Sequence, residues 1–309
     1  MAVTSEPVLA IDVGGTRMKG SVVDAAGREL HGCTRPTPRA DGPDAVVEAV
    51  VAFAADLTAR AGGVAAAGIV VPGIVDEDSG TAVLSANLGW RDLPMRSVLE
   101  ARLGVPLAFG QDVRAGGLAE VRLGAARGAR DALFVPIGTG IGAAVVLDGR
   151  PVSGSGFAGE IGHLVVDAGG AACGCGLRGC LETVASAPAV ARRYAARTGR
   201  ATPVPEIAAA AGRGDDPAAV AVWAEAVDAL AGVFATCATL LGPEIVVVGG
   251  GLAESGALLL DPLRAALDGR LSFQRRPRVV RAALGDRAGA LGAGLMARER
   301  LQAGVGSAR

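Results

Sequence analysis

Three apolar runs along the chain end in glycines. Residues 8–15 (VLAIDVGG), 133–142 (LFVPIGTGIG) and 244–251 (EIVVVGGG) each combine aliphatic residues with a closing glycine cluster. Apolar runs of this length that end in glycines predict buried strands followed by tight turns. The first two runs lie about 125 residues apart, and each is followed by a second apolar run and a turn. The chain is therefore predicted to contain two related halves that each open with a hairpin.

Helical periodicity fills the stretches between these strands. Apolar residues recur at helical spacing over 44–60, and Asp44 is a candidate cap for that helix. Asp216 followed by proline predicts a helix over 217–241 that ends at Gly242.

A final helical pattern, at about residues 287–302, carries Gly289, Gly292 and Gly294. Glycine weakens a helix, so close packing against another element is the expected compensation. Strands mixed with helices throughout the chain predict an α/β protein.

Composition narrows the class of protein. The 309 residues suffice for one large domain or two ordinary ones, half of them are hydrophobic, and the net charge is −1 with both signs interspersed. This balance gives no electrostatic footprint for nucleic acid or an anionic membrane. The N-terminal residues do not resemble a signal peptide, and the longest mostly apolar stretch, about 229–241, is too short for a membrane span. Five cysteines, three of them clustered, do not resemble a secreted disulfide framework, so we expect a cytoplasmic protein.

The loop after the first strand places Asp12 beside Gly14, Gly15 and Thr16. Glycines let backbone N–H groups approach phosphate oxygens, and the threonine adds a hydroxyl donor. A carboxylate at the strand end is placed to hold a hydrated Mg²⁺. The loop is not a Walker A sequence, because a hairpin follows it and GxxxxGK[ST] is absent. Taken alone, it is equally well read as a plain glycine-rich hairpin.

Two further glycine loops favour nucleotide binding. Gly138, Thr139 and Gly140 occupy the equivalent place in the second half, and two facing loops can grip one polyphosphate from both sides. Gly250 and Gly251 leave bare backbone against which a nucleotide base can lie.

Three of the five cysteines fall within eight residues. Cys173, Cys175 and Cys180 follow His163, one of only two histidines, by ten, twelve and seventeen positions. Four N and S ligands with no open position are the set that a structural tetrahedral Zn²⁺ site requires. A disulfide and a redox pair are the alternatives, and a cytosolic chain disfavours the disulfide.

Two carboxylates flank this cluster. Glu160 precedes His163 by three positions, and Glu182 follows Cys180 by two. A metal between them would hold both acceptors rigid, which suits a ligand rich in hydroxyl groups. Without a metal, both would be ordinary surface acids.

Asp112 is a third candidate carboxylate. It follows a predicted strand at residues 105–109 and precedes a helix of small residues. Carboxylates at the carboxyl ends of strands face the ligand crevice of open α/β sheets, where Asp112 could accept a proton from an attacking hydroxyl. The alternative is that Asp112 only caps the helix.

Together these motifs resemble the ROK family of sugar kinases and repressors, within the actin–hexokinase–Hsp70 ATPase superfamily. Residues 10–16 (AIDVGGT) look like the first phosphate loop of the family. Residues 159–163 (GEIGH) followed by 173–182 (CGCGLRGCLE) look like its signature. The resemblance covers about residues 8–297.

The resemblance implies a two-domain actin-like ATPase fold, ribonuclease H-like, with an interdomain cleft. We expect a smaller domain over 1–115 and a larger domain over 116–296 that carries the zinc site. The helix at about 297–309 is a candidate to pack on the first domain.

The resemblance also assigns roles. Asp112 matches the catalytic base. The sugar contacts that it implies are Gly73, Asn87, Asp112, Glu160, His163 and Glu182. The phosphate contacts that it implies are Asp12, Gly14, Gly15, Thr16, Gly138, Thr139 and Gly140. The zinc ligands that it implies are His163, Cys173, Cys175 and Cys180. His163 would then serve zinc through one ring nitrogen and the sugar through the other.

Two departures from the family pattern stand out. The family usually has Asn-Asp-x-Asn around the base, whereas this chain has Gln111 and Arg114 in the places of the two asparagines. The lysine often found after Gly-Gly-Thr is Arg17, with Lys19 nearby.

The function expected from these features is ATP- and Mg²⁺-dependent phosphorylation of a hexose at its 6-hydroxyl, with glucose as the first substrate to test. N-acetylmannosamine, N-acetylglucosamine and fructose are the alternative substrates, and polyphosphate is an alternative donor. A non-catalytic sugar-binding regulator is the alternative of another class. Family repressors carry an additional N-terminal helix-turn-helix domain, which does not fit before Asp12. The expected partners are the sugar and ATP without nucleic acid or membrane, and the expected assembly is a homodimer or homotetramer.

Overall fold

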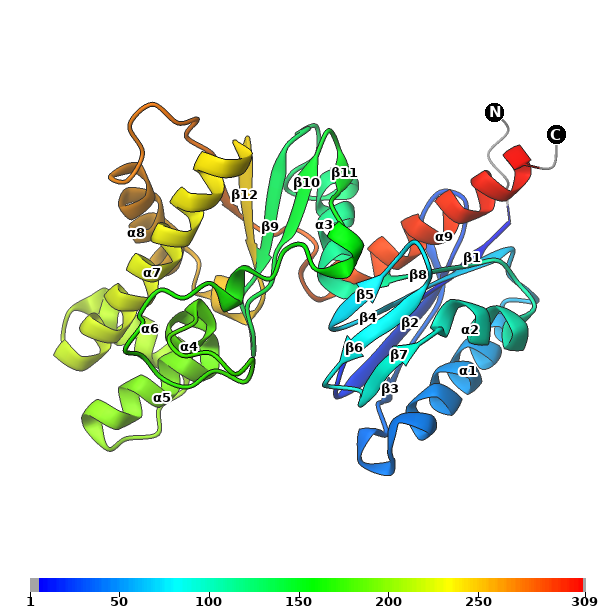
Figure 1. Ribbon diagram of the computed structural model, residues 1–309, viewed down its shortest axis with the longest axis horizontal. Helices are drawn as coiled ribbons and strands as arrows, with labels where there is room; N and C mark the ends of the chain where they lie inside the picture. Colours follow the sequence, from blue (N-terminus) through cyan, green and yellow to red (C-terminus); the bar gives the residue numbers. More distant parts are fainter. Residues whose placement is uncertain (1–5, 308–309) are drawn as a thin grey trace. The chain divides into compact units, whose positions relative to one another are not determined.

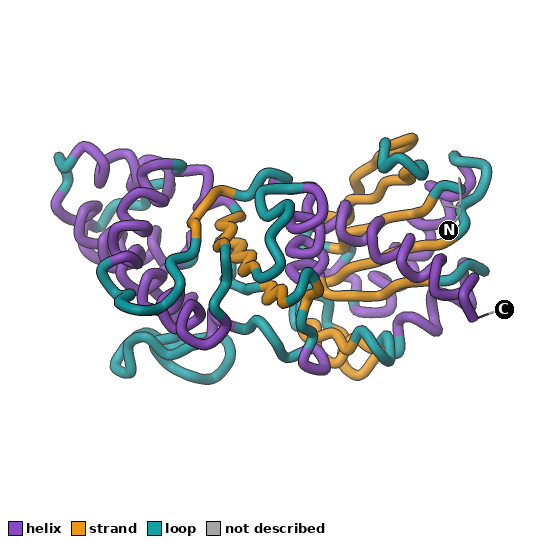
Figure 2. Tube along the Cα trace, turned by 90° about the horizontal axis from the view of Figure 1, so that it is seen from above, coloured by secondary structure: helices purple, strands orange, loops and turns teal. Residues whose placement is uncertain are grey.

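The computed structural model describes residues 6–307 and divides into two compact units. Unit 1 comprises Met1–Ala119, Pro151–Ala158 and Arg287–Arg309, and unit 2 comprises Glu120–Arg150 and Gly159–Asp286. Each unit contains its own five-stranded sheet with helices packed against it (Figure 1, Figure 2).

The sheet of unit 1 has the order β3-β2-β1-β4-β8. Its strands are β1 (Val8–Val13), β2 (Arg17–Val23), β3 (Glu29–Pro36), β4 (Ala66–Val71) and β8 (Leu107–Gln111). The first three strands form antiparallel pairs, whereas β1, β4 and β8 run parallel. The carboxyl ends of β1, β4 and β8 therefore lie at one edge of the sheet.

Helices cover both faces of this sheet (Figure 1). Helices α1 (Pro43–Arg60) and α2 (Met95–Leu103) lie on one face, and α9 (Ala288–Ser307) packs along β1, β4 and β8 on the other. The backbones approach closely, since a Cβ added at Gly68 would lie 1.9 Å from the Ala293 carbonyl oxygen of α9. Helix α3 (Asp112–Leu123) follows β8, and η1 (Arg39–Asp41) precedes α1. The additional small sheet, not predicted from the sequence, has the order β5-β6-β7 with strands Ile74–Asp76, Thr81–Ser85 and Trp90–Leu93.

The N-terminal caps of two helices can be compared with the sequence. Asp44 lies in the first turn of α1, and the N-cap position belongs to Gly42, so the predicted cap is wrong. The prediction for α7 (Pro217–Leu241) is confirmed, because the Asp216 side chain accepts hydrogen bonds from two backbone amides of its first turn and Gly242 ends the helix in the left-handed conformation.

The sheet of unit 2 has the order β11-β10-β9-β12-β13 and repeats the plan of unit 1. Its strands are β9 (Ala132–Pro136), β10 (Ala144–Leu147), β11 (Arg150–Pro151), β12 (Ile245–Gly249) and β13 (Arg278–Arg281). An antiparallel hairpin is again followed by parallel strands, β9, β12 and β13. The predicted pair of related halves is therefore confirmed.

Helix α7 forms the centre of the helical layer in unit 2 and contacts α4, α5, α6 and α8. These helices span Leu181–Ala185, Ala187–Thr198, Val204–Arg213 and Ala257–Asp268, and short 3-10 turns lie at η2 (Gly154–Gly156, in unit 1), η3 (Ile161–His163), η4 (Gly251–Ser255) and η5 (Gly285–Arg287). Helix α7 has 25 residues, more than the apolar stretch seen in the sequence, and is long and apolar enough by composition to cross a membrane. Half of its most apolar window is nevertheless buried, and Trp223, Leu230 and Phe234 on it belong to the core of unit 2.

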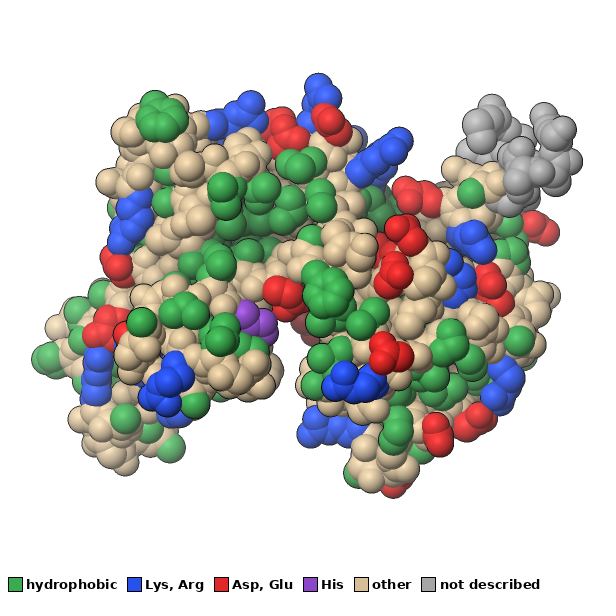
Figure 3. Space-filling model, viewed as in Figure 1, with side chains coloured by type: hydrophobic (Ala, Val, Ile, Leu, Met, Phe, Trp, Pro, Cys, Tyr) green, Lys and Arg blue, Asp and Glu red, His purple; other side chains and the backbone are tan. Residues whose placement is uncertain are grey.

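The glycines of α9 pack as the sequence predicted. A Cβ added at Gly292 would lie 2.0 Å from the Ala115 carbonyl oxygen of α3, and one added at Gly289 would lie 2.6 Å from Asp12 Oδ2. Acidic and basic residues are interspersed along the sequence, and side chains of both signs are also interspersed on the face drawn in Figure 3.

Candidate functional site

Unit 1 gathers one set of predicted site residues at the carboxyl ends of its parallel strands. In the sheet register, Asp12 of β1 lies opposite Val70 of β4, and Val70 lies opposite Gly110 of β8. Asp12 and the residues that follow β8 are therefore neighbours across β4. This edge is where ligands bind in open α/β sheets.

Two loops complete this edge. A Cβ on Gly15 would lie 3.4 Å from the Asn87 Cβ, so the first glycine loop touches the loop after β6. Gly73, in the turn after β4, has a φ of +111° and lies against the Leu84 carbonyl. The predicted contacts Asp12, Gly15, Gly73, Asn87 and Asp112 thus share one region of unit 1.

The first glycine loop is held by its own hydrogen bonds. The Gly14 amide donates to the Arg17 carbonyl at 2.9 Å, and the Thr37 hydroxyl donates to the Gly14 carbonyl at 2.6 Å. The Thr37 amide donates to the Thr16 carbonyl at 2.9 Å. The Gly14 amide therefore closes the turn, which leaves the amides of Gly15 and Thr16 as the candidate phosphate donors of this loop.

Asp112 is the first residue of α3 and directly follows β8. The side chain that caps α3 is that of Gln111, whose Oε1 accepts a hydrogen bond from the Arg114 amide at 2.7 Å. Asp112 Oδ1 accepts from the Val113 amide at 2.8 Å. The half-buried Asp112 carboxylate is thus not needed as the helix cap.

Unit 2 brings the other two glycine loops together. The Ile137 amide donates to the Gly249 carbonyl at 2.9 Å, and the Leu252 amide donates to the Ile137 carbonyl at 3.0 Å. A Cβ added at Gly250 would lie 2.4 Å from the same carbonyl, so only glycine fits there. Residues 138–140 and 250–251 therefore follow adjacent parallel strands, as two walls of one nucleotide site would.

Glu182 links the second glycine loop to the segment that carries the cysteines. It lies in the first turn of α4, two residues after Cys180, and its Oε2 accepts a hydrogen bond from the Ile141 amide at 3.0 Å. Glu160 lies three residues before His163, with its Oε2 4.0 Å from His163 Nε2.

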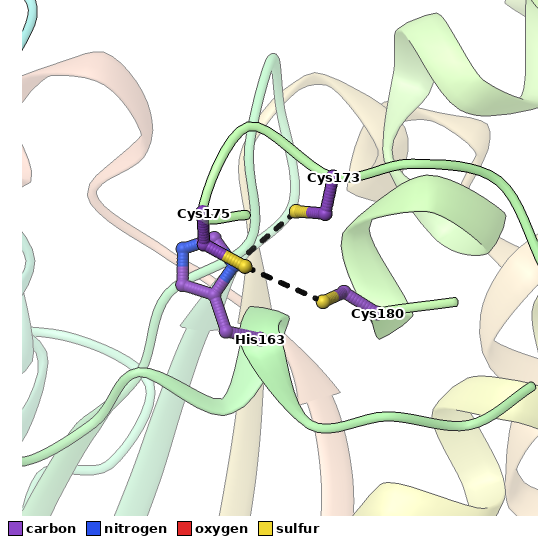
Figure 4. A group of neighbouring side chains, drawn as sticks. All are labelled: His163, Cys173, Cys175 and Cys180. Carbon is purple, nitrogen blue, oxygen red and sulfur yellow. Dashed lines mark hydrogen bonds between the residues drawn. The ribbon is translucent and has the colours of Figure 1, made fainter. Parts of the chain in front are cut away.

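His163, Cys173, Cys175 and Cys180 converge, and their ligand atoms all lie within 4.8 Å of one another (Figure 4). His163 Nδ1 lies 3.6 Å from Cys173 Sγ, and Cys175 Sγ lies 3.7 Å from Cys180 Sγ. Bonds of about 2.3 Å to sulfur and 2.05 Å to nitrogen around a tetrahedral Zn²⁺ give ligand separations of about 3.6–3.8 Å. The two separations given above match this range, so the four residues form a candidate zinc site.

Turns hold the cysteines in this arrangement. The Cys173 amide donates to the Leu177 carbonyl at 2.8 Å, and the Gly176 amide donates to the Cys173 carbonyl at 3.1 Å. Gly179 has a φ of +67°, and a Cβ there would lie 1.4 Å from the Asp167 carbonyl oxygen. Glycine at this position is therefore a steric requirement for the fold of the loop.

The thiols differ in electrostatic environment. Burial raises the pKa of the Cys180 thiol to about 12. A hydrogen bond with the Leu177 backbone lowers the pKa of the exposed Cys175 thiol. Without a metal, Cys180 therefore holds its proton at neutral pH, and metal binding must displace it.

The sequence did not point to Glu77. This residue follows β5 and lies within hydrogen-bonding distance of Arg114 and of the Gln111 amide, beside Asp112. One feature of the sequence could have suggested a residue such as Glu77. Arg114 stands where the family usually has asparagine, and an arginine that is buried there requires a carboxylate partner.

The comparisons with known proteins agree with this geometry. Residues 8–300 match the ROK family. A glucokinase from Streptomyces coelicolor is 33% identical over 94% of this chain and 97% of its own length. Among solved structures, a ROK hexokinase from Thermus thermophilus superposes with a TM-score of 0.82 at 35% identity, over 96% of this chain and 99% of that one. A ROK family glucokinase from Streptomyces griseus, in complex with glucose and AMPPNP, gives 0.81 at 31% identity, over 95% and 99%.

The chain belongs to the ROK family. Its two related sheets and the ROK kinase structures confirm the predicted two-domain actin-like ATPase fold.

Proposed function

We propose that this protein is an ATP-dependent hexose kinase that phosphorylates the 6-hydroxyl of glucose. The observation that carries the proposal is the Asp112 carboxylate at the carboxyl end of β8, at the same sheet edge as Asp12 and the first glycine loop. The glucokinase from Streptomyces coelicolor and the glucose complex from Streptomyces griseus support glucose as the substrate.

Asp112 acts as the general base. It accepts the proton of the sugar hydroxyl as that oxygen attacks the γ-phosphorus of ATP, and the bond from phosphorus to the bridging oxygen of ADP breaks. The Gly14 and Gly138 amides close their own turns, so the backbone amides at 15–16 and 139–140 are the ones that donate to the phosphate oxygens, where negative charge accumulates. Asp12 would hold Mg²⁺, which supplies charge neutralisation for the phosphates when bound.

Glu160, His163 and Glu182 bind the sugar hydroxyls. Carboxylates accept hydrogen bonds, and two such acceptors together with an imidazole suit the several hydroxyls of a hexose. His163, Cys173, Cys175 and Cys180 would hold a structural zinc ion. His163 Nδ1 lies 3.6 Å from the Cys173 sulfur (Figure 4), whereas Nε2 lies 4.0 Å from Glu160 Oε2 and would contact the sugar.

A coupled assay for ADP release tests the function. The purified protein is given ATP and Mg²⁺ with glucose, mannose, fructose, N-acetylglucosamine or N-acetylmannosamine, and ³¹P NMR identifies the product. We expect glucose to give the highest kcat/KM and the product to carry its phosphate on the 6-hydroxyl. A faster N-acetylhexosamine or fructose would correct the substrate within the kinase class, and a parallel reaction with polyphosphate tests the donor.

The variant Asp112→Asn separates catalysis from binding. Loss of the base should lower kcat by about 10²–10⁴-fold, while calorimetry still detects glucose binding. A wild-type protein that binds sugar but transfers phosphate to none of the panel would be a sugar-binding regulator, and the kinase proposal would be wrong.

A further inference from the structure

The residue two positions after Asp112 is a buried arginine. Arg114 lies in the first turn of α3 and is only 2% exposed. Burying a guanidinium is costly unless its donors meet acceptors. Its contacts should therefore show what it does.

Three acceptors surround the Arg114 guanidinium. Nε donates to Glu77 Oε1 at 2.8 Å, Nη2 donates to the Val75 carbonyl at 2.7 Å, and Nη1 donates to the Gly156 carbonyl at 3.3 Å. Val75 and Glu77 belong to β5 and the turn after it, whereas Gly156 lies in the Pro151–Ala158 segment of the same unit. One side chain therefore ties α3 to two segments that are distant in sequence.

Glu77 and Gln111 close this network around the start of α3. Glu77 Oε1 also accepts a hydrogen bond from the Gln111 amide at 3.2 Å, and Gln111 Oε1 accepts from the Arg114 amide at 2.7 Å. Glu77, Arg114 and Gln111 thus form a closed ring of hydrogen bonds that includes the backbone on both sides of Asp112.

We propose that Arg114 and Glu77 are positioning residues for Asp112. The inference rests on the proposed role of Asp112 as the base. The ring fixes the backbone from 111 to 114, and with it the direction in which the Asp112 carboxylate leaves the helix. A catalytic group must be held within about 0.5 Å of its productive position, and a displacement of about 1 Å can cost 10²-fold in rate.

The test compares Arg114→Ala, Arg114→Lys and Glu77→Gln with wild type. Each variant is checked for cooperative unfolding, and calorimetric titration with glucose gives the binding-competent fraction. We expect Arg114→Ala to lower kcat per competent molecule by about 10–100-fold while the Kd for glucose changes less than about 3-fold. Arg114→Lys keeps the charge without the planar fork, so its kcat should lie between those of wild type and Arg114→Ala.

Arg96 provides the matched control. From α2, its guanidinium donates to the main-chain oxygens of Glu77 and Asp78, so it holds the same turn without using the Glu77 carboxylate. Arg96→Ala should lower the melting temperature and leave kcat within about 2-fold of wild type, as expected for a purely structural arginine.

A second readout distinguishes positioning of the base from damage to the sugar site. A displaced base lowers kcat by the same factor for glucose and mannose, whereas an altered sugar site changes the ratio of kcat/KM between these epimers. The proposal is overturned if Arg114→Ala keeps the kcat of wild type, or if Arg96→Ala lowers kcat as much as Arg114→Ala does. It is also overturned if Arg114→Ala changes the glucose-to-mannose ratio of kcat/KM by a larger factor than it changes kcat. Should Arg114→Ala fail to fold, Arg114→Lys and Glu77→Gln decide by the same criteria. If wild type phosphorylates no sugar, the proposed function itself has failed instead.

Discussion

Glu182 Oε2 accepts a hydrogen bond from the Ile141 amide at 3.0 Å, which joins the helix after the cysteine cluster to the second glycine loop. A Cβ added at Gly140 would lie 2.5 Å from the same oxygen, so the loop and the carboxylate are packed in direct contact. The candidate sugar ligand therefore also shapes the candidate phosphate loop within unit 2.

Glu182 variants test this double role. Glu182→Gln keeps an oxygen that can accept from Ile141 but removes the charge, whereas Glu182→Ala removes both. A hydrogen bond to a charged group contributes about 1.5–3 kcal/mol, so we expect Glu182→Gln to raise the KM for glucose about 10–100-fold with little change in the KM for ATP. Glu182→Ala should raise both KM values.

Steady-state kinetics with each substrate varied in turn provide the measurement. Glu206→Gln, which replaces an exposed acid in the first turn of α6, serves as the control and should behave like wild type. If Glu182→Gln and Glu182→Ala changed the KM for glucose and the KM for ATP by the same factors, the charge of Glu182 would have no separate role in sugar binding.

Asp12 can be tested without replacing it, because Gly289 of α9 lies against its carboxylate. A methyl group at position 289 would lie 2.6 Å from Asp12 Oδ2, so Gly289→Ala must displace that carboxylate. If Asp12 holds Mg²⁺, the variant should need about 10-fold more Mg²⁺ for half-maximal rate and have a lower kcat.

Gly294→Ala is the control for this experiment. The added methyl would lie 3.5 Å from Val23 Cγ2 and 3.6 Å from the Ala10 Cβ, which are ordinary contacts. Both substitutions replace glycine by a better helix former, worth up to about 1 kcal/mol of unfolding free energy. A loss of activity confined to Gly289→Ala assigns the effect to Asp12, and no change in the Mg²⁺ dependence would count against Asp12 as its ligand.

Local patterns in the sequence were enough to predict much of the fold. The hairpin and glycine loop of each half depend on short apolar runs, and the start and end of α7 depend on Asp216 and Gly242, which act within one turn of the helix. The convergence of His163 with the three cysteines was predictable because four N and S ligands at this spacing favour a tetrahedral metal site over a disulfide or a redox pair.

Other features depend on contacts between distant segments. Glu77 and Arg114 are 37 residues apart, so an arginine at position 114 could suggest a carboxylate partner but could not identify it as Glu77. The small sheet of β5, β6 and β7 has strands of three to five residues, too short for periodicity to detect. Asp44 failed as a cap because Gly42 already occupies that position, one residue before the proline at N1.

The zinc site makes a prediction about metal content and pH. Metal analysis should find about one zinc per chain, and Cys175→Ser should remove it and weaken glucose binding. Burial raises the pKa of Cys180 to about 12, so below that pH the metal-free thiol is protonated and zinc must displace a proton. Zinc affinity should therefore fall as the pH is lowered, by about 10-fold per pH unit for each proton that binding releases.

Competition with a chelator at pH 6, 7 and 8 measures this dependence. Cys33→Ser, at a cysteine outside the cluster, should keep its zinc and its pH dependence. Native protein without zinc, or an affinity that does not vary with pH, would contradict the assignment of these four ligands.

The acid stability of unit 2 should depend on Asp216. Its carboxylate accepts hydrogen bonds from the Tyr194 hydroxyl at 2.6 Å, from Arg200 Nη2 at 2.6 Å and from two amides at the start of α7. The hydrogen bond from Tyr194, with those from the α7 amides, lowers the pKa of Asp216 below its ordinary value of 3.8. A depressed pKa means that the folded protein favours the ionised carboxylate. The resulting stabilisation is complete above pH 3.8, the unfolded value, and is lost as the pH falls through the folded value.

Asp216→Asn keeps an oxygen for the helix cap and cannot ionise, so it isolates this contribution. We expect the variant to be less stable than wild type at pH 6, and the difference in unfolding free energy to shrink steadily between pH 4 and pH 2.5. Urea unfolding of both proteins across this range gives the difference, in which carboxylates common to the two proteins cancel. Asp215→Asn, which affects a neighbouring exposed ion pair with Arg213, should show a much smaller difference at every pH. If the Asp216→Asn difference stayed constant or grew as the pH fell, charge on Asp216 would not be the source of its stabilising effect, and the cap alone would account for it.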